Sequence, residues 1–258
     1  MATTSKPQSR TASPQKTAAK PNKGPIVVHV VHANAVAINF SISSDALRES
    51  IPQGLTIDHY KGDTFVSLVC MELKRVPFCG LPIVPRFCEL SLRCFVSERE
   101  NPQHKGVYYL KYYTSSKFGS WVLGNLIPHQ PQQLSIKANN KIVGQNPPEL
   151  DYQWKVEGHD NRLRIRGRDQ IVRRESAGKL EFILAHSSRY LSLKGQTTAY
   201  DVSRPKWVLW DAAQANFTCD VRRLFGKKYV KPLAARPVSV FLSAGSPVAL
   251  HKSRTLGD

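Results

Sequence analysis

The sequence is poor in acidic residues and lacks long apolar runs. Nineteen Asp and Glu stand against 37 Lys and Arg, which gives a formal net charge of +18. No stretch approaches the ~18 consecutive apolar residues of a membrane-spanning helix, so we expect no membrane span. The first apolar run, residues 26–31, is too short and begins too late for a secretory signal. We therefore expect a soluble, cytoplasmic protein.

Cysteine is scarce and loosely spaced. The chain has five, Cys70, Cys79, Cys88, Cys94 and Cys219, and no C-x-x-C pair of the kind that cysteine-based metal sites use. The eight histidines are scattered, and there is no Walker-type loop, no G-x-G-x-x-G after a strand and no G-x-S-x-G elbow. We expect reduced thiols packed in the core, no metal site and no bound cofactor.

Positive charge is abundant, and part of it lies in a distinct N-terminal segment. Residues 1–24 hold five basic residues, no acid and no large apolar side chain after Met1. Such a segment cannot bury enough surface to offset its ordering entropy, so we predict a disordered basic tail. Residues 25–258 carry the remaining +13 and have a size that suits one hydrophobic core. We predict a single domain there.

Short runs rich in Val, Ile, Leu, Phe and Tyr recur after the tail, separated by Gly, Pro, Asn and Ser. This pattern is typical of strands and turns. The runs predict strands at residues 26–32, 64–74, 89–97, 107–113, 162–166, 179–185, 207–211 and 238–243. One short helix is predicted between Ser44, as its cap, and Pro52. A second is predicted from Ser115 or Ser116 to Pro128. The fold class is therefore mainly β (α+β).

The strand at residues 89–97 places two opposite charges on one face. With period-two alternation, one side of the strand carries Leu90, Leu92, Cys94 and Val96. The other side carries Glu89, Ser91, Arg93 and Phe95. Glu89 and Arg93 would then lie ~13 Å apart along the strand. They form either a binding site or a solvent-facing polar side, and alternation alone does not decide between the two.

The next strand, which ends at Tyr113, is rich in tyrosine and pairs with residues 89–97 as a hairpin. Alternation groups Val107, Tyr109, Lys111 and Tyr113 on one face. A one-residue slip of the unknown register would reverse which face meets Arg93. The tyrosines suit either a packed core or the wall of a pocket, so Tyr109 is a candidate ligand contact.

Five runs of sequence, in order, resemble one family. They are IPQGLTIDHYKGDTFVSLVCMELKRV, CELSLRCFV, GVYYLKYY, HSSRYLSL with PKWVLWDAA, and VSVFLSAGSPVAL. Together they are similar to the YqjF-like family of uncharacterised bacterial proteins (domain of unknown function 2071), within the acetoacetate-decarboxylase-like superfamily. The resemblance covers nearly all of residues 26–250. It implies an antiparallel sheet curled into a cone-shaped barrel with a central cavity and a few peripheral helices.

The resemblance also implies which residues would carry chemistry. In the decarboxylases a buried lysine after one strand forms a Schiff base with a keto acid, and a glutamate of the preceding strand helps to hold the substrate. Glu89 matches that glutamate, but Thr114 and Ser115 stand where adjacent lysines are expected. Neither side chain can form an imine, so a standard acetoacetate decarboxylase is not expected. Lys117 and Lys111 are the weak catalytic candidates that remain.

The C-terminal half of the resemblance is more divergent. The Arg-Tyr pair that the family keeps is matched by Arg189 and Tyr190, which alternation sends to opposite faces of a strand. The late motif departs from the family at three positions, Phe241, Leu242 and Pro247.

Two functions are compatible with these observations. In the leading hypothesis, the protein binds a small anionic or carbonyl-bearing molecule in a central cavity, through Glu89, Arg93, Tyr109, Arg189 and Tyr190. The alternative is binding of nucleic acid or an anionic surface through the tail and a basic segment that runs from Arg162 to Arg174 and holds six arginines. The sequence leaves ligand identity, turnover and a homo-oligomeric state open.

Overall fold

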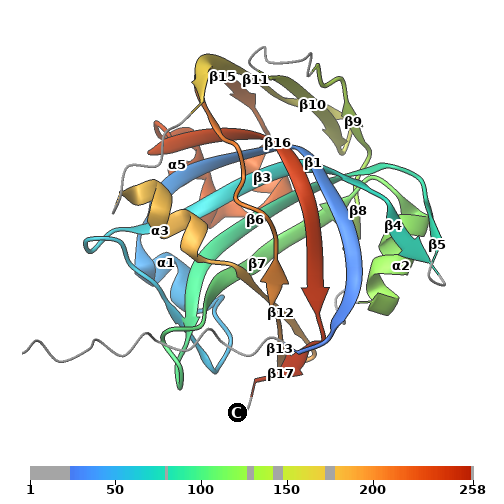
Figure 1. Ribbon diagram of the computed structural model, residues 1–258. Coiled ribbons are helices and arrows are strands. Elements are labelled where there is room, and N and C mark those ends of the chain that lie inside the picture. Colours follow the sequence, from blue (N-terminus) through green and yellow to red (C-terminus); the bar gives the residue numbers. More distant parts are fainter. Residues whose placement is uncertain (1–23, 79–80, 127–130, 142–147, 172–177, 257–258) are drawn as a thin grey trace, which may run out of the picture.

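The computed structural model describes residues 24–78, 81–126, 131–141, 148–171 and 178–256, and these ranges form a mainly β structure (Figure 1). One large sheet runs in the order β17-β13-β12-β7-β6-β3-β1-β16-β15-β11-β10-β9. Pairing is antiparallel except where β12 and β8 pair with β7. The mainly β prediction is confirmed. Within the described ranges the strand order is an open path, so closure into a cone-shaped barrel stays a prediction.

The centre of the sheet consists of five long strands, whose blue, green and red ribbons lie side by side in Figure 1. They are β1 (Ile26–Ile42), β3 (Thr64–Lys74), β6 (Phe87–Glu98), β7 (Lys105–Thr114) and β16 (Ser239–His251). One flank continues through β12 (Ser188–Leu193), β13 (Gln196–Tyr200) and β17 (Arg254–Thr255). The other continues through β15 (Trp210–Thr218), β11 (His159–Ile171), β10 (Glu149–Val156) and β9 (Ile136–Ala138). Short strands complete the fold: β2 (Leu55–Ile57), β4 (Val76–Phe78), β5 (Leu81–Val84), β8 (Gln132–Gln133) and β14 (Val202–Ser203).

Strand alternation divides the interior into two apolar clusters, one on each face of the central strands. In β6 the first cluster takes Leu90, Leu92, Cys94 and Val96, the set that the sequence groups together. In β3, Val66, Leu68 and Cys70 join the first cluster, whereas Val69, Met71 and Leu73 join the second. Because these strands are buried on both faces, the polar face of β6 is enclosed in the protein and does not face solvent.

The helices are short and lie at the periphery. α1 (Ser44–Arg48) is capped by Ser43, one residue before the predicted cap, and α2 (Lys117–Leu126) lies where the second helix is predicted. The sequence patterns did not indicate α4 (Val221–Leu224), the 3-10 helix η1 (Lys227–Tyr229) or α5 (Val230–Ala234). None of the helices described here is long and apolar enough to cross a membrane.

Two strand predictions need correction. Residues 179–185, predicted as a strand, form the helix α3 (Lys179–Ala185). Their short apolar run fits either state, and contacts of Phe182 with Tyr60, Phe65 and Phe95 hold the helical turn against the sheet. The strand predicted at residues 207–211 begins only at Trp210. Residues 1–23 of the predicted tail (1–24) lie outside the described residues.

A β-bulge corrects the predicted faces of β7. Leu92 pairs with Lys111 but Arg93 pairs with Tyr109, which leaves Leu110 as the extra residue. The extra residue reverses the alternation beyond it. Tyr109 and Tyr112 therefore belong to the second cluster and Tyr113 to the first, so the predicted grouping of Tyr109 with Tyr113 is wrong.

Candidate functional site

A cavity of about 110 Å³ lies on the side of the sheet that carries the polar face of β6. Its polar wall includes His32, Arg93, His186, Arg189 and Arg204. Its apolar wall includes Val36, Val69, Met71, Val107, Trp207 and Leu209. The cavity thus joins residues from both ends of the chain, and three of its polar side chains are arginines.

Arg93 is fixed by its neighbours on the same face of β6. Its Nε donates to Ser91 Oγ over 2.9 Å, and its Nη2 is hydrogen-bonded to Glu89 Oε1. Ser91 Oγ also donates to Glu89 Oε1 over 3.0 Å. Glu89 is 0% exposed and Arg93 is 9% exposed. The two side chains extend toward each other along the strand and bridge the ~13 Å between their backbone positions. Because both residues are buried, the alternative of a solvent-facing polar side is wrong.

An aromatic ring supports the same guanidinium. Arg93 lies over the ring of Tyr109, with 4.5 Å from Cζ to the ring centroid, and Tyr109 packs at 5.0 Å on Tyr112. Burial opposes the charge of Arg93, but Tyr109 and the carboxylate of Glu89 outweigh it and raise the pKa of the guanidinium. The cavity wall therefore holds a permanent, oriented cation.

A histidine that the sequence did not single out faces this cation. The pKa of His32, which is 3% exposed, is lowered well below its usual value, first by burial and then by the charges of Arg189, Arg93 and Arg204. Arg189 Nη2 lies 3.0 Å from His32 Nε2. A bulge of β1 between Ala33 and Val36 follows His32 directly, and no pattern in the sequence indicates it. His32 is a neutral ring among cations.

The helix α3 closes one side of the cavity and is held by a second polar cluster. His186, just after α3, has Nδ1 2.7 Å from the carbonyl oxygen of Phe182 and Nε2 3.0 Å from Asp58 Oδ2. Lys105 Nζ donates to the same carboxylate oxygen over 2.7 Å. Partial burial opposes the charge of Asp58, yet the bonds from His186 and Lys105 hold its pKa well below the usual range. The cluster ties α3 to β7 and to Asp58, which directly follows β2.

The other predicted site residues lie elsewhere. Tyr190 belongs to the first apolar cluster, on the opposite face from the cavity, and its hydroxyl donates to Glu98 Oε1 over 2.8 Å. Lys111 is half-buried in β7, and Lys117 is exposed at the first residue of α2. Neither lysine is among the residues that line the cavity. Glu89 lies behind Arg93 rather than on the cavity wall.

The positions where the resemblance implies lysines carry hydroxyls with local hydrogen bonds. Thr114 pairs directly with Glu89 across β6 and β7, and its Oγ1 lies 2.7 Å from Ser120 Oγ. Ser115 Oγ accepts from the backbone N–H of Cys88 over 2.8 Å. These side chains anchor the start of α2 and supply no amine to the site.

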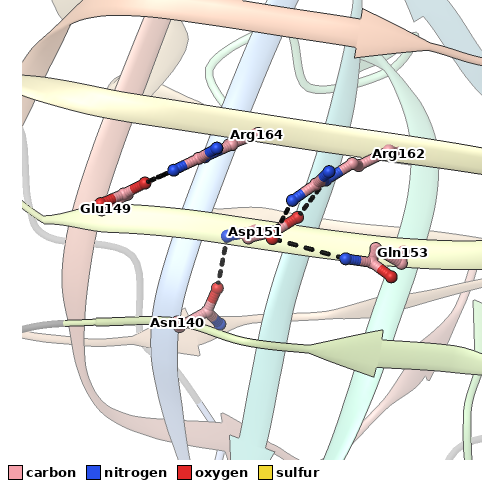
Figure 2. Close-up of polar contacts among 6 residues, drawn as sticks. All are labelled: Asn140, Glu149, Asp151, Gln153, Arg162 and Arg164. Carbon is pink, nitrogen blue, oxygen red and sulfur yellow. Dashed lines mark hydrogen bonds and ion pairs between the residues drawn. The ribbon is translucent and has the colours of Figure 1, made fainter.

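The arginines of the basic segment that lie on β11 form an exposed row, but part of their charge is paired. Arg162 donates to both carboxylate oxygens of Asp151, over 2.9 and 2.7 Å, and Arg164 donates to Glu149 (Figure 2). Asp151 also accepts from Gln153, and its backbone N–H donates to Asn140. Residues 172–174 lie outside the described ranges. Because Asp151 and Glu149 of β10 neutralise Arg162 and Arg164, this row attracts the phosphates of nucleic acid less strongly.

The chain belongs to the DUF2071 family, described as an uncharacterized conserved protein, whose model matches residues 31–247. No curated protein matches the chain.

Solved structures share the fold at low identity. The enduracididine biosynthesis enzyme MppR complexed with pyruvate is 14% identical at a TM-score of 0.63, over 93% of this chain and 94% of that one. Acetoacetate decarboxylase from Legionella pneumophila subsp. pneumophila str. Philadelphia 1 is 12% identical at a TM-score of 0.61, over 95% and 93%. An acetoacetate decarboxylase-like enzyme from Sphingomonas wittichii RW1 is 9% identical at 0.62, over 89% and 92%. These likenesses concern the fold.

Proposed function

We propose that the protein binds a small anionic or carbonyl-bearing molecule in the cavity between β1, β6 and β12, without Schiff-base decarboxylation. The observation that carries the proposal is Arg93, a buried and permanently charged guanidinium held in one orientation on the cavity wall. Its described partners contact Nε and Nη2, which leaves the two N–H groups of Nη1 for a ligand. Arginine and carboxylate form short, charge-assisted hydrogen bonds.

The charge and size of the cavity favour the same class of ligand. Arg93 is paired with Glu89, and Arg189 and Arg204 lie on the same wall, whose lining among the described residues includes no Asp or Glu. One water needs roughly 10–15 Å³ of such a cavity, so about 110 Å³ suits a molecule with on the order of ten non-hydrogen atoms. The pyruvate complex of MppR is consistent with a short carboxylic acid in this fold.

A thermal-shift panel of short carboxylic and keto acids tests the proposal. A ligand at ~100 times its Kd adds ~2.7 kcal/mol to the free energy of unfolding. At ~2–4 °C per kcal/mol for a chain of this size, we expect a Tm shift of roughly 5–10 °C. The shift should persist at high salt, because a buried pair is screened little.

Two matched variants locate the binding. Arg93→Met should abolish the shift, and Arg166→Met, which removes an exposed arginine of another strand, should leave it intact. A shift that survives in Arg93→Met, or no shift with any acid of the panel, contradicts the proposal.

A further inference from the structure

We infer that the cationic outer side of residues 221–236 binds the anionic headgroups of a phospholipid bilayer. The short helices α4, η1 and α5 make up most of this segment. None of its residues is among those that line the cavity, so the inference concerns a second surface of the molecule and does not depend on the proposed function.

The inner side of the segment fixes it to the protein. Five large side chains of the segment are buried in the first apolar cluster: Val221, Leu224, Phe225, Tyr229 and Leu233. Neighbours in this set are mostly three or four residues apart, a spacing that places them on one side of successive helical turns. The residues between them therefore point outward from a packed support.

Cations dominate the outer side of the segment. Residues 221–236 contain six Lys and Arg and no Asp or Glu. All six are exposed: Arg222, Arg223, Lys227, Lys228, Lys231 and Arg236. Among the described residues only Arg223 has acidic partners, Asp220 and Glu157, and Lys228 donates to the neutral hydroxyl of Ser50. Five positive charges of this surface therefore have no counter-charge in the described part of the chain.

The uncharged side chains exposed on the same segment are aliphatic. Val230 is 39% exposed, and Ala234 and Ala235 are exposed as well. The segment has no Ser, Thr, Asn or Gln, and its aromatic residues, Phe225 and Tyr229, are buried. Proteins that bind nucleic acid use such polar groups and exposed aromatic rings for contacts with phosphates and bases. Cations that accompany aliphatic side chains instead suit the headgroup region of an anionic bilayer.

Co-sedimentation of the full chain with vesicles tests the inference. We expect binding to phosphatidylcholine vesicles that contain about 30% phosphatidylserine and none to phosphatidylcholine alone, because the attraction is electrostatic. Binding should weaken as salt screens the exposed charges. One cation near an anionic surface corresponds to about fivefold in affinity, so Lys227→Gln combined with Lys231→Gln should weaken binding about 25-fold. Val230→Ser should weaken it about 3- to 10-fold by removing an aliphatic contact.

A second double variant controls for net charge. Lys137→Gln combined with Lys252→Gln, at exposed positions outside the segment, removes the same charge and should leave vesicle binding nearly unchanged. All of these positions are exposed, so we expect the variants to fold, which circular dichroism checks. The N-terminal tail is the same in every variant and does not affect the comparison.

Three results would overturn the inference. The first is the absence of binding to anionic vesicles, or equal binding to both kinds of vesicle. The second is an equal loss of binding in the two double variants, which would assign the effect to net charge. The third is binding of a double-stranded oligonucleotide that is lost in Lys227→Gln with Lys231→Gln and is not weakened by Val230→Ser, while anionic vesicles are not bound. That result would make the segment a nucleic-acid surface.

Discussion

Removing one partner of the Glu89–Arg93 pair should strongly destabilise the protein. The side chains are 0% and 11% exposed, so Glu89→Leu leaves a guanidinium in the interior without its counter-charge. Breaking a buried pair in this way costs about 3–5 kcal/mol. For a chain of this size the cost corresponds to a fall in Tm of roughly 6–20 °C.

A double-mutant cycle separates the pair from simple loss of packing. Arg93→Met should cost a similar amount, because it strands the carboxylate of Glu89. The double variant should lose much less than the sum, since replacing a whole buried pair by apolar groups is often close to neutral. Urea denaturation followed by circular dichroism measures the three free energies of unfolding. The exposed pair of Asp45 and Arg48, 79% exposed on both sides, is the control and should contribute less than about 1 kcal/mol.

Two results would refute this reasoning. One is a cost below about 1 kcal/mol for Glu89→Leu, which would mean that Arg93 reaches solvent or another anion. The other is additivity of the two single variants, which would mean that the carboxylate and the guanidinium do not interact. A short carboxylic acid should also restore part of the stability of Glu89→Leu by replacing the lost charge.

Three further outcomes follow. Burial, with help from Arg189, lowers the pKa of His32 in the folded state. The contribution of His32 to stability should therefore be full above about pH 6.5 and should be lost as the pH falls below that value. Urea titrations at a series of pH values should show a smaller loss of stability toward low pH in His32→Phe. Gly245→Ala should destabilise the protein in thermal melts, because φ at Gly245 is +99° and the added carbon meets the backbone of β1. Borohydride with a keto acid should leave Lys117 unmodified in mass spectra, and a trapped adduct there would contradict the absence of imine chemistry.

The alternation of residues 89–97 predicted the site best. It placed Glu89 and Arg93 on one face and the apolar set on the other, and the buried pair and the first cluster have that arrangement. The alternation of side chains between the two faces of a strand is a local property of an extended chain, so it can be predicted from the sequence alone. Whether that face met solvent depended on strands far away in the chain, and the pattern left it open.

The features that the sequence missed all depend on distant contacts. The bulges at Leu110 and after His32 change the facing of residues without any local signal in composition. Residues of α3 became helical because Phe182 packs against rings of other segments. The meeting of His32 with Arg189 joins positions 157 residues apart, which no local pattern predicts.

The pairing of β1 with β16 also has a consequence for biosynthesis. His32 and Ser243 both line the cavity, and they come from strands that join residues 26–42 to residues 239–251. During translation β1 gains this neighbour only after the chain has been made as far as residues 239–251, and contacts of such sequence separation form slowly. The pocket therefore does not exist in a nascent chain that stops before β16. Small-molecule protection against proteolysis should appear only once that last long strand has left the ribosome.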